Sequence, residues 1–228
     1  MSSHILDRPV WSAFTGRQAD RAIRRGLAFR VAPAFGLFAA AADTSTEALS
    51  DLGTLVVENG GGGLVELAAP PPIPGTQVVS SAMCLQMVAE TVAPAWDVAF
   101  EMLPLGDADA AEMLALATLT KPGPFFARTH QLGSFLGVRL DGQLVAMAGE
   151  RMRPEGHTEA SGVCVHPDHR GKGYAARLLR EVTARILARG EKAFLHSYAD
   201  NTAAIGLYES LGYRGRREVV FTILTADQ

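Results

Sequence analysis

Apolar positions in the second half of the chain alternate between a helical period and a strand period. Residues 172–189 place apolar side chains at helical spacing, and Gly190 follows where the pattern ends. Residues 107–120 are rich in alanine, leucine and methionine and begin with two aspartates, which favour the N-terminal end of a helix. A third, shorter helix is predicted at residues 201–211, before Gly212.

Strand patterns separate these helices. Residues 134–140 and 143–152 flank Asp141-Gly142, a dipeptide typical of a hairpin turn. Three further strands are predicted, at residues 157–165, 192–198 and 219–224. The elements therefore follow one another as helix, hairpin, strand, helix, strand, helix, strand. This order predicts a mixed α/β fold whose strands at 157–165 and 192–198, joined by a crossover helix, are parallel neighbours.

The first half has weaker patterns and predicts a smaller α/β unit. Arginine-rich residues 15–26 suggest a short polar helix, and residues 45–52 a second one, capped by Thr44 or Ser45. Residues 54–58 and 64–68 are β-type runs around Asn59 and four glycines, which predicts a hairpin. The prolines of residues 70–75 exclude regular structure, residues 77–90 form an apolar segment of undetermined type, and residues 93–96 look like a connector. We therefore expect two units, residues 1–95 and 100–228.

Composition narrows the classes of function. The formal net charge is −3 over 228 residues, so no broad electropositive face is implied, which argues against nucleic-acid binding. The apolar stretch at residues 31–42 is too short to span a bilayer, and residues 1–10 do not resemble a signal peptide; we expect a cytoplasmic protein without membrane contact. The two cysteines predict buried free thiols, with a disulfide between them as the less favoured alternative, and no spacing suggests a metal site.

The most informative segment is the turn from Arg170 to Ala175. Gly171 and Gly173 allow successive backbone N–H groups to point into one concavity at the start of a helix, where the dipole also favours an anion. Arg170 and Lys172 add positive charge, so a diphosphate is the natural ligand. The alternative without a ligand is an ordinary helix start with two solvated cations.

A dinucleotide fingerprint is a second alternative, because Gly171, Gly173 and Ala176 fit G-x-G-x-x-A. That fingerprint places its first glycine directly after a strand, whereas five residues intervene here. It also expects an acidic residue about twenty positions later, at the end of the next strand. Glu191 precedes that strand and Asp200 follows it late, so the pattern does not favour a dinucleotide.

Residues 163–175 resemble the acyl-CoA-binding motif of the GNAT superfamily of N-acetyltransferases. The family pattern Q/R-x-x-G-x-G/A is matched by Arg170, Gly173 and Ala175. Residues 201–213 also resemble the family's N-x-x-A-x-x-L-Y-x-x-x-G-F/Y motif, with Asn201 and Tyr208 in place. Two motifs in the right order are far more specific than either alone, and together the resemblance covers about residues 100–228.

The resemblance implies a GNAT-like fold in which two central parallel strands splay apart, and acetyl-CoA or another acyl-CoA as co-substrate, with no metal. The pantetheine arm would lie in the gap and pair with the backbone near Val163 and Val165. Cys164 would be a core residue, although an acyl-cysteine intermediate is an open alternative. The cofactor-binding residues so expected are Val163, Cys164, Val165, Arg170, Gly171, Lys172, Gly173, Tyr174, Ala175, Asn201 and Tyr208.

Direct transfer needs an acid for the departing thiolate and a base for the amine proton. The resemblance places Tyr208 beside the sulfur as the acid, although it is also a plausible packing residue. Glu150 and Glu159 are the candidate bases, His157 and His196 weaker ones, and water could replace all of them. Asn201 either contacts the cofactor or caps its helix.

The sequence therefore predicts an acyl-CoA-dependent N-acyltransferase, with acetyl as the expected group. The acceptor is a primary amine: a small amine, an amino acid or a peptide N-terminus. The alternative is a non-catalytic CoA-binding regulatory module. The first 95 residues are either a degenerate copy of the fold, a protein-interaction unit or a wall of the acceptor pocket, and a homodimer is an open alternative. The loop at residues 125–129 is either an acceptor contact or an aromatic anchor.

Overall fold

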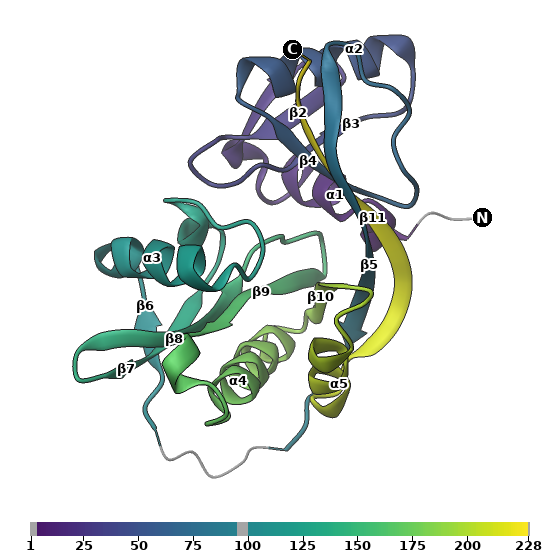
Figure 1. Cartoon of the computed structure of the whole chain (residues 1–228). Helices are drawn as coiled ribbons and strands as arrows, with labels where there is room; N and C mark the ends of the chain where they lie inside the picture. The colour runs from purple at the N-terminus through teal and green to yellow at the C-terminus, as the bar shows by residue number, and fades with distance from the viewer. Residues whose placement is uncertain (1–3, 95–99, 228) are drawn as a thin grey trace.

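The structure, a computed structural model, describes residues 4–94 and 100–227. An eight-stranded sheet has the order β4-β11-β5-β10-β9-β8-β7-β6, and a three-stranded sheet has the order β1-β2-β3 (Figure 1). The strands are β1 (Ala22–Arg25), β2 (Ala28–Val31), β3 (Ala39–Ala41), β4 (Gly62–Glu66), β5 (Thr76–Ala89), β6 (Leu103–Leu105), β7 (Phe135–Leu140), β8 (Gln143–Glu150), β9 (His157–Val165), β10 (Lys192–Tyr198) and β11 (Arg214–Ala226). The helices are α1 (Pro9–Thr15), α2 (Thr46–Glu58), α3 (Ala110–Thr120), α4 (Tyr174–Ala188) and α5 (Thr202–Ser210).

The predicted elements of the second half are confirmed with small shifts at their ends, except that the last strand, β11, begins at Arg214 instead of residue 219; β6 was not predicted. Helix α4 buries Leu178, Leu179, Val182 and Ile186, the stripe that its helical period predicts, against β8, β9 and β10. Helix α3 lies on the same sheet and buries Met113 and Leu116. The mixed α/β fold expected from the element order is therefore present.

Strands β9 and β10 are parallel, as predicted, and they splay apart. Their pairing covers only Lys192↔His157, Ala193↔Thr158 and Phe194↔Glu159. Beyond these pairs β9 continues to Val165 beside β8, and β10 continues to Tyr198 beside β5. The backbone of β9 that faces β10 is thus left without a partner strand within the described ranges, and a gap opens in the middle of the sheet.

The longest strands, β5 and β11, join the two halves of the chain. Strand β5, from the first half, lies between β10 and β11, and β11 in turn pairs with β4. The segment at residues 77–90, whose type the pattern left undetermined, is therefore a strand. The expected boundary near residue 95 falls between strands of one sheet, and the division into two domains stays a prediction.

Each half repeats one topology. In the second half, β7-β8-β9 is followed by helix α4 and the parallel strand β10; in the first half, β1-β2-β3 is followed by helix α2 and β4. Phe38, just before β3, forms one parallel bridge with Gly63 of β4, so these segments, like β9 and β10, pair over only a short length. This repetition supports the interpretation of the first half as a degenerate copy of the fold.

Three predictions for the first half are wrong. The helix expected at residues 15–26 is replaced by a 3₁₀ turn (Ala19–Arg21) and β1. The strand expected at residues 54–58 continues α2, because Leu52, Leu55 and Val56 form one buried helical face. The hairpin around Asn59 is therefore absent, and β4 pairs with β11 instead.

Other expectations for the first half hold. The helix at residues 45–52 is present, and Ser45 caps it by accepting a hydrogen bond from the Ala48 N–H at 3.3 Å. Both cysteines are buried free thiols. The connector at residues 93–96 lies partly outside the described residues. Across the described ranges, no helix is long and apolar enough to cross a membrane.

Candidate active site

The turn between β9 and α4 has the geometry of an anion site. Gly171 and Gly173 adopt φ values of +77° and +79°, which only glycine takes without strain. Gly173 is the N-cap of α4, a helix of 15 residues. The N–H groups of residues 171–176 donate to no other group in the described part of the chain. They are therefore free for an anion, at the positive end of the helix dipole.

A cleft runs from this turn along β9, and we call it the phosphate cleft. It is lined by Thr120, Pro122, Val163, Cys164, Val165, His169, Arg170, Gly171, Gly173, Tyr174, Ala175, Ala176, Ala203, Ala204 and Leu207. Most of the predicted cofactor-binding residues are thus brought together. Lys172 is the exception within the turn: its Nζ lies 3.4 Å from His169 Nδ1 and it is exposed. The Tyr174 side chain is buried, and its ring lies edge-on to that of Phe100 with a centroid distance of 4.7 Å. Its backbone is therefore part of the turn, while its side chain is part of the core.

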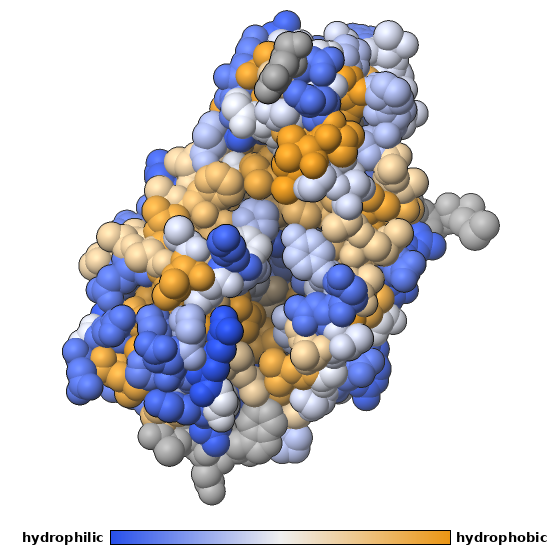
Figure 2. Space-filling model, in the orientation of Figure 1, coloured by the Kyte–Doolittle hydropathy of each residue, from blue (hydrophilic) through white to orange (hydrophobic). Residues whose placement is uncertain are grey.

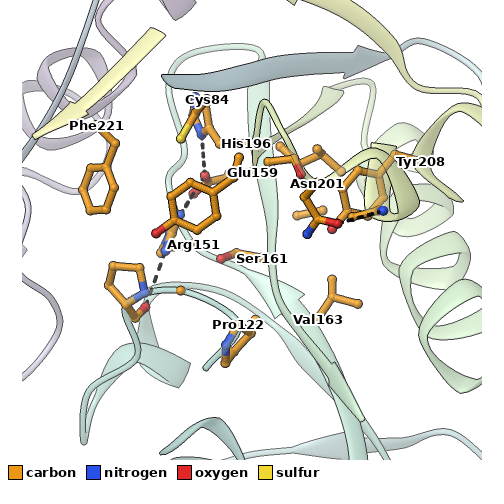
Figure 3. Close-up of a pocket in the computed structure, with 18 of the residues that line it drawn as sticks. Cys84, Pro122, Arg151, Glu159, Ser161, Val163, His196, Asn201, Tyr208 and Phe221 are labelled. Carbon is orange, nitrogen blue, oxygen red and sulfur yellow. Dashed lines mark hydrogen bonds and ion pairs between the residues drawn. The ribbon is translucent and has the colours of Figure 1, made fainter. Parts of the chain in front are cut away.

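A second cavity, which we call the reaction cavity, continues from the phosphate cleft. The two share Thr120, Pro122, Val163, Ala175, Ala204 and Leu207. Figure 3 shows that Tyr208 and Asn201 of the α5 region face Ser161 and Val163 of β9 across it. Glu159, Arg151 and His196 lie further in, and Cys84 and Phe221 form its far end. The gap between β9 and β10 therefore connects an anion site to a mixed polar and apolar chamber.

Tyr208 is suited to donate a proton. Burial raises its pKa above the ordinary value of 10, so the phenol stays protonated at neutral pH. Its ring packs against Tyr213 with a centroid distance of 6.3 Å. Asn201 lines the same cavity, and its side-chain oxygen accepts a hydrogen bond from the Ala204 N–H at 3.2 Å, so it caps α5.

Glu159 lies in the reaction cavity but is not free to act as a base. Its carboxylate accepts two hydrogen bonds from Arg151 and one from His196 Nδ1, each at 2.9 Å. Burial alone would raise the pKa of Glu159, but the charge of Arg151 and the hydrogen bonds from His196 and Arg151 outweigh it and hold the pKa at about 2. An anion so firmly paired has little tendency to take a proton from an amine.

The two nitrogens of His196 are also engaged. Nδ1 faces Glu159, and Nε2 lies 3.0 Å from Gln86 Nε2. The Gln86 amide is fixed, because its oxygen accepts from Arg216 and its nitrogen donates to the Leu6 carbonyl. His196 therefore donates through Nδ1 and accepts through Nε2, which leaves no nitrogen for an amine proton.

We expect Glu159→Gln to destabilise the protein by about 3 kcal/mol at pH 7, because it leaves the buried Arg151 without a counter-charge. The folded-state pKa of Glu159 is lowered from 4.5 to about 2, so its stabilising effect is complete above pH 4.5 and disappears as the pH falls towards 2. Thermal unfolding followed by circular dichroism across this range should show a smaller acid dependence in the variant. Glu155→Gln, at an exposed position of the connection between β8 and β9, serves as the control. Equal acid sensitivity in wild type and Glu159→Gln would contradict the assignment.

The structure does not bring Glu150 to either cavity. This carboxylate is buried and pairs with Arg189, whose Nη2 lies 2.8 Å from Oε1. Arg189 is the C-cap of α4, so the pair ties the end of that helix to the end of β8. Glu150 therefore has a structural partner and no access to the reacting atoms.

Cys164 has the environment of a core residue. It packs against Met113 and Leu116 of α3, and burial raises the pKa of its thiol to about 11. A thiol that stays protonated at neutral pH is a poor nucleophile. These facts favour the core role over an acyl-cysteine intermediate.

The loop at residues 125–129 acts as an anchor. Phe125 packs edge-on against Phe135 at 5.7 Å, and Arg128 lies over the Phe35 ring at 4.6 Å. None of these loop residues lines the two cavities described above. The neighbouring segment from Lys121 to Pro124 does line the reaction cavity.

Several residues of the reaction cavity were not predicted. Phe38, Val65, Cys84, Tyr198 and Phe221 come from five separate segments, and no local pattern signals that they meet. Arg151 could have been found, because an arginine and a glutamate eight residues apart on either side of a strand connection favour a cross-strand ion pair.

Comparisons with known proteins agree with this geometry. The family model described as FR47-like protein matches residues 135–222. The chain is 35% identical over 115 residues to the N-alpha-acetyltransferase RimI of Mycobacterium tuberculosis, which covers 46% of this chain and 72% of that protein. A solved structure from Novosphingobium aromaticivorans, described as an acetyltransferase of the GNAT family, is 46% identical with a TM-score of 0.92 over 99% of this chain and 100% of that one.

A GCN5-related N-acetyltransferase from Kribbella flavida shares the fold at 20% identity, with a TM-score of 0.67 over 100% of this chain and 97% of that one. The resemblance noted in the two motifs thus extends to the whole chain, first half included. Together with the anion turn and the splayed strands, these relatives identify the chain: it belongs to the GNAT family of acetyltransferases.

Proposed function

We propose that this protein transfers the acetyl group of acetyl-CoA to the nitrogen of a primary amine by direct attack. One observation carries the proposal: the phosphate cleft and the reaction cavity share lining residues at the gap between β9 and β10, and Tyr208 lines that cavity. A donor bound along the cleft would have its thioester near the phenol, with room beyond for an acceptor.

The residues present fit acetyl-CoA. The free N–H groups of residues 171–176 and the cation of Arg170 suit a diphosphate. The backbone of β9 beyond Glu159 has no partner strand on the β10 side in the described ranges, so it can hydrogen-bond an extended amide chain such as the pantetheine arm. In the proposal, one of its N–H groups near Val163 would polarise the thioester carbonyl.

In the proposed reaction the amine nitrogen forms a bond to the thioester carbonyl carbon, and the bond from that carbon to sulfur breaks. Tyr208 donates its proton to the departing thiolate, giving free CoA. Tyr208 then regains a proton from solvent, and the nitrogen loses one proton, which balances the reaction. We assign this proton to solvent, because Glu159 and His196 are fully engaged and Glu150 lies outside the cavity.

The acceptor is proposed to be a peptide N-terminus, with a small amine or an amino acid as alternatives. The relative from Mycobacterium tuberculosis is named an N-alpha-acetyltransferase, which supports the peptide. A cytoplasmic location, where both acetyl-CoA and nascent peptides occur, is part of the proposal. A non-catalytic CoA-binding module is less well supported, because such a module has no need of a protonated phenol in the cavity beside the cleft.

An amine-panel assay with acetyl-CoA tests the function. Thiol release is followed with small amines, amino acids and short peptides, and products are identified by mass spectrometry. Turnover of at least one amine class is expected. Tight CoA binding without turnover on any amine would contradict the enzymatic function and favour the regulatory module.

A further inference from the structure

Strand β5 has an open edge beside the reaction cavity. It pairs with β11 along its whole length but with β10 only from Cys84 to Ala89. The Ala199 N–H donates to the Met83 carbonyl at 3.0 Å, and the chain then turns away into α5. From Ala82 back to Thr76, the side of β5 in line with β10 therefore has no partner strand in the part of the chain that the structure describes.

This edge lacks the charged residues and the proline that usually protect an edge strand. No charged residue occurs from Thr76 to Ala89, and Val78 and Val79 are 58% and 62% exposed. By contrast, the outer strand β1 of the smaller sheet carries Arg24 and Arg25, and the outer strand β6 carries Pro104. Natural proteins blunt edges with charges and proline, so an uncharged apolar edge marks a binding surface.

The edge begins where the cavity wall ends. Cys84 and Tyr198 lie opposite each other on β5 and β10, and both line the reaction cavity. Phe221, opposite Ala82 on β11, lines it too. Figure 2 shows hydrophobic side chains gathered above the hollow between the two halves, on the face where Figure 1 places the upper part of β5.

We propose that the open edge of β5, from Thr76 to Ala82, docks the acceptor peptide as an added strand and delivers its N-terminal amine to the reaction cavity beside Tyr198. This inference rests on the proposed function. Strand addition supplies backbone hydrogen bonds to an extended peptide and pockets for alternate side chains. The surface fits a peptide whose first residues are uncharged and partly apolar.

The direction of the ladder supports a peptide with a free N-terminus. An added strand antiparallel to β5 runs in the same direction as β10 and starts beside Ala199, where β10 ends. Its N-terminus therefore lies next to Tyr198, at the cavity. A parallel strand would place the C-terminus there instead, and antiparallel pairs are the commoner arrangement.

The length of the edge argues against a second copy of this chain as the occupant. A β-bulge at Val79, between the pairs Ser80↔Ile223 and Val78↔Leu224, divides the edge into two stretches of three residues. A stable dimer needs roughly 1,000 Å² of well-packed interface or more, which two such short stretches do not supply. A short ladder suits a substrate that must be released after each turnover.

Ser81→Pro tests the proposal. Residues two positions apart in a strand direct their backbone N–H and C=O groups to the same side. The Met83 carbonyl accepts from Ala199 on the β10 side, so the Ser81 N–H points to the open edge. Proline, which lacks this N–H, is tolerated there. The probe is a seven-residue peptide of alternating threonine and valine with a free N-terminus. We expect kcat/KM for this peptide to fall about tenfold, the loss of one or two hydrogen bonds, with the KM for acetyl-CoA unchanged.

A second pair of variants separates the edge from a general effect of charge. Val79→Lys adds a charge to the open edge of β5, and Ile23→Lys adds one to an exposed apolar position of β1, an outer strand of the smaller sheet. Val79→Lys should weaken the peptide reaction while Ile23→Lys does not. Turnover of benzylamine, which has no peptide backbone, should be the same in all variants. Unchanged peptide turnover in both Ser81→Pro and Val79→Lys would overturn the proposal.

Binding measurements distinguish failure of the edge from failure of the proposed function. Fluorescence anisotropy with a labelled, N-acetylated form of the probe peptide, in the presence of CoA, reports docking without catalysis. If no amine is turned over but the peptide binds wild type and not Ser81→Pro, the proposed function fails and the docking edge stands. If sedimentation shows a wild-type dimer that Val79→Lys dissociates, the edge joins two copies and the proposal is overturned.

Discussion

Replacing Gly173 with aspartate is expected to weaken acetyl-CoA binding by about 100-fold or more while the protein stays folded. A carboxylate at the N-cap of α4 would compete with a diphosphate for the free N–H groups and repel its charge. A Cβ built at Gly173 meets no atom within 4 Å, so the side chain fits the structure. Isothermal titration with CoA measures the loss, and thermal unfolding checks the fold.

Gly190→Asp is the matched control. Gly190 lies just beyond the other end of α4, has a φ of +76° compared with +79° at Gly173, and also has open space around its Cβ position. Both substitutions therefore impose the same backbone strain of about 1 kcal/mol. Only the one at the turn should change CoA affinity. Equal affinities for Gly173→Asp and wild type would show that the donor does not bind at this turn.

Tyr208→Phe is expected to lower kcat by about 100-fold, the usual effect of losing a general acid, with little change in the KM for acetyl-CoA. The change removes only the hydroxyl that would protonate the thiolate. Because burial raises the pKa of Tyr208 above 10, ionisation of the phenol should lower the wild-type kcat only above pH 10, and this decline should be missing from the variant. Steady-state rates from pH 7 to pH 10.5 measure both effects.

Tyr213→Phe provides the comparison for a purely structural tyrosine. The Tyr213 hydroxyl is buried and lies 2.7 Å from Thr183 Oγ1, which itself donates to the Leu179 carbonyl. Its loss should cost about 1 kcal/mol of stability and leave kcat unchanged. A Tyr208→Phe enzyme with wild-type kcat would exclude Tyr208 as the acid.

The second half of the fold was predictable because its elements are locally consistent. The stripe of α4 and the turn glycines at Asp141-Gly142 and Gly190 each indicate one structure with no strong competitor. The parallel pairing of β9 and β10 followed from the helix between them.

The first half was harder because local propensity and tertiary context disagree there. Thr54, Val56 and Val57 are β-branched and favour a strand, yet they lie in α2, whose buried face packs against β2 and β3. In residues 15–26, the arginines suggested a helix, but Gly16 and Gly26 leave room only for a turn and a short strand. Pairing with distant strands decided both cases, and no local pattern contains that information.

The residues of the candidate site also fall into a group that the sequence could predict and a group that it could not. The turn from Arg170 to Ala175 and the Asn201–Tyr208 segment are each one contiguous stretch of sequence, so a motif can reveal them. The far end of the reaction cavity depends on side chains that the topology alone brings together, such as Phe38 and Phe221. The role of Glu150 could not be judged from sequence, because its partner Arg189 is 39 positions away and meets it only in three dimensions.

Strand β5 of the first half pairs with β10 and β11 of the second half, and β11 also pairs with β4; this arrangement affects how the chain folds. Val220 pairs with Glu66 and Thr222 with Ser81, so the seam of the large sheet joins residues that are about 140 to 155 positions apart. Contacts between residues so far apart in the sequence form slowly. During synthesis on a ribosome, the apolar edge of β5 would stay exposed until β10 and β11 had been synthesised. Neither half of the chain contains the strand that completes its own part of the large sheet. A fragment cut near residue 95 would therefore lack one strand of its sheet. The strand edge left without a partner would be exposed and could pair with any extended chain nearby.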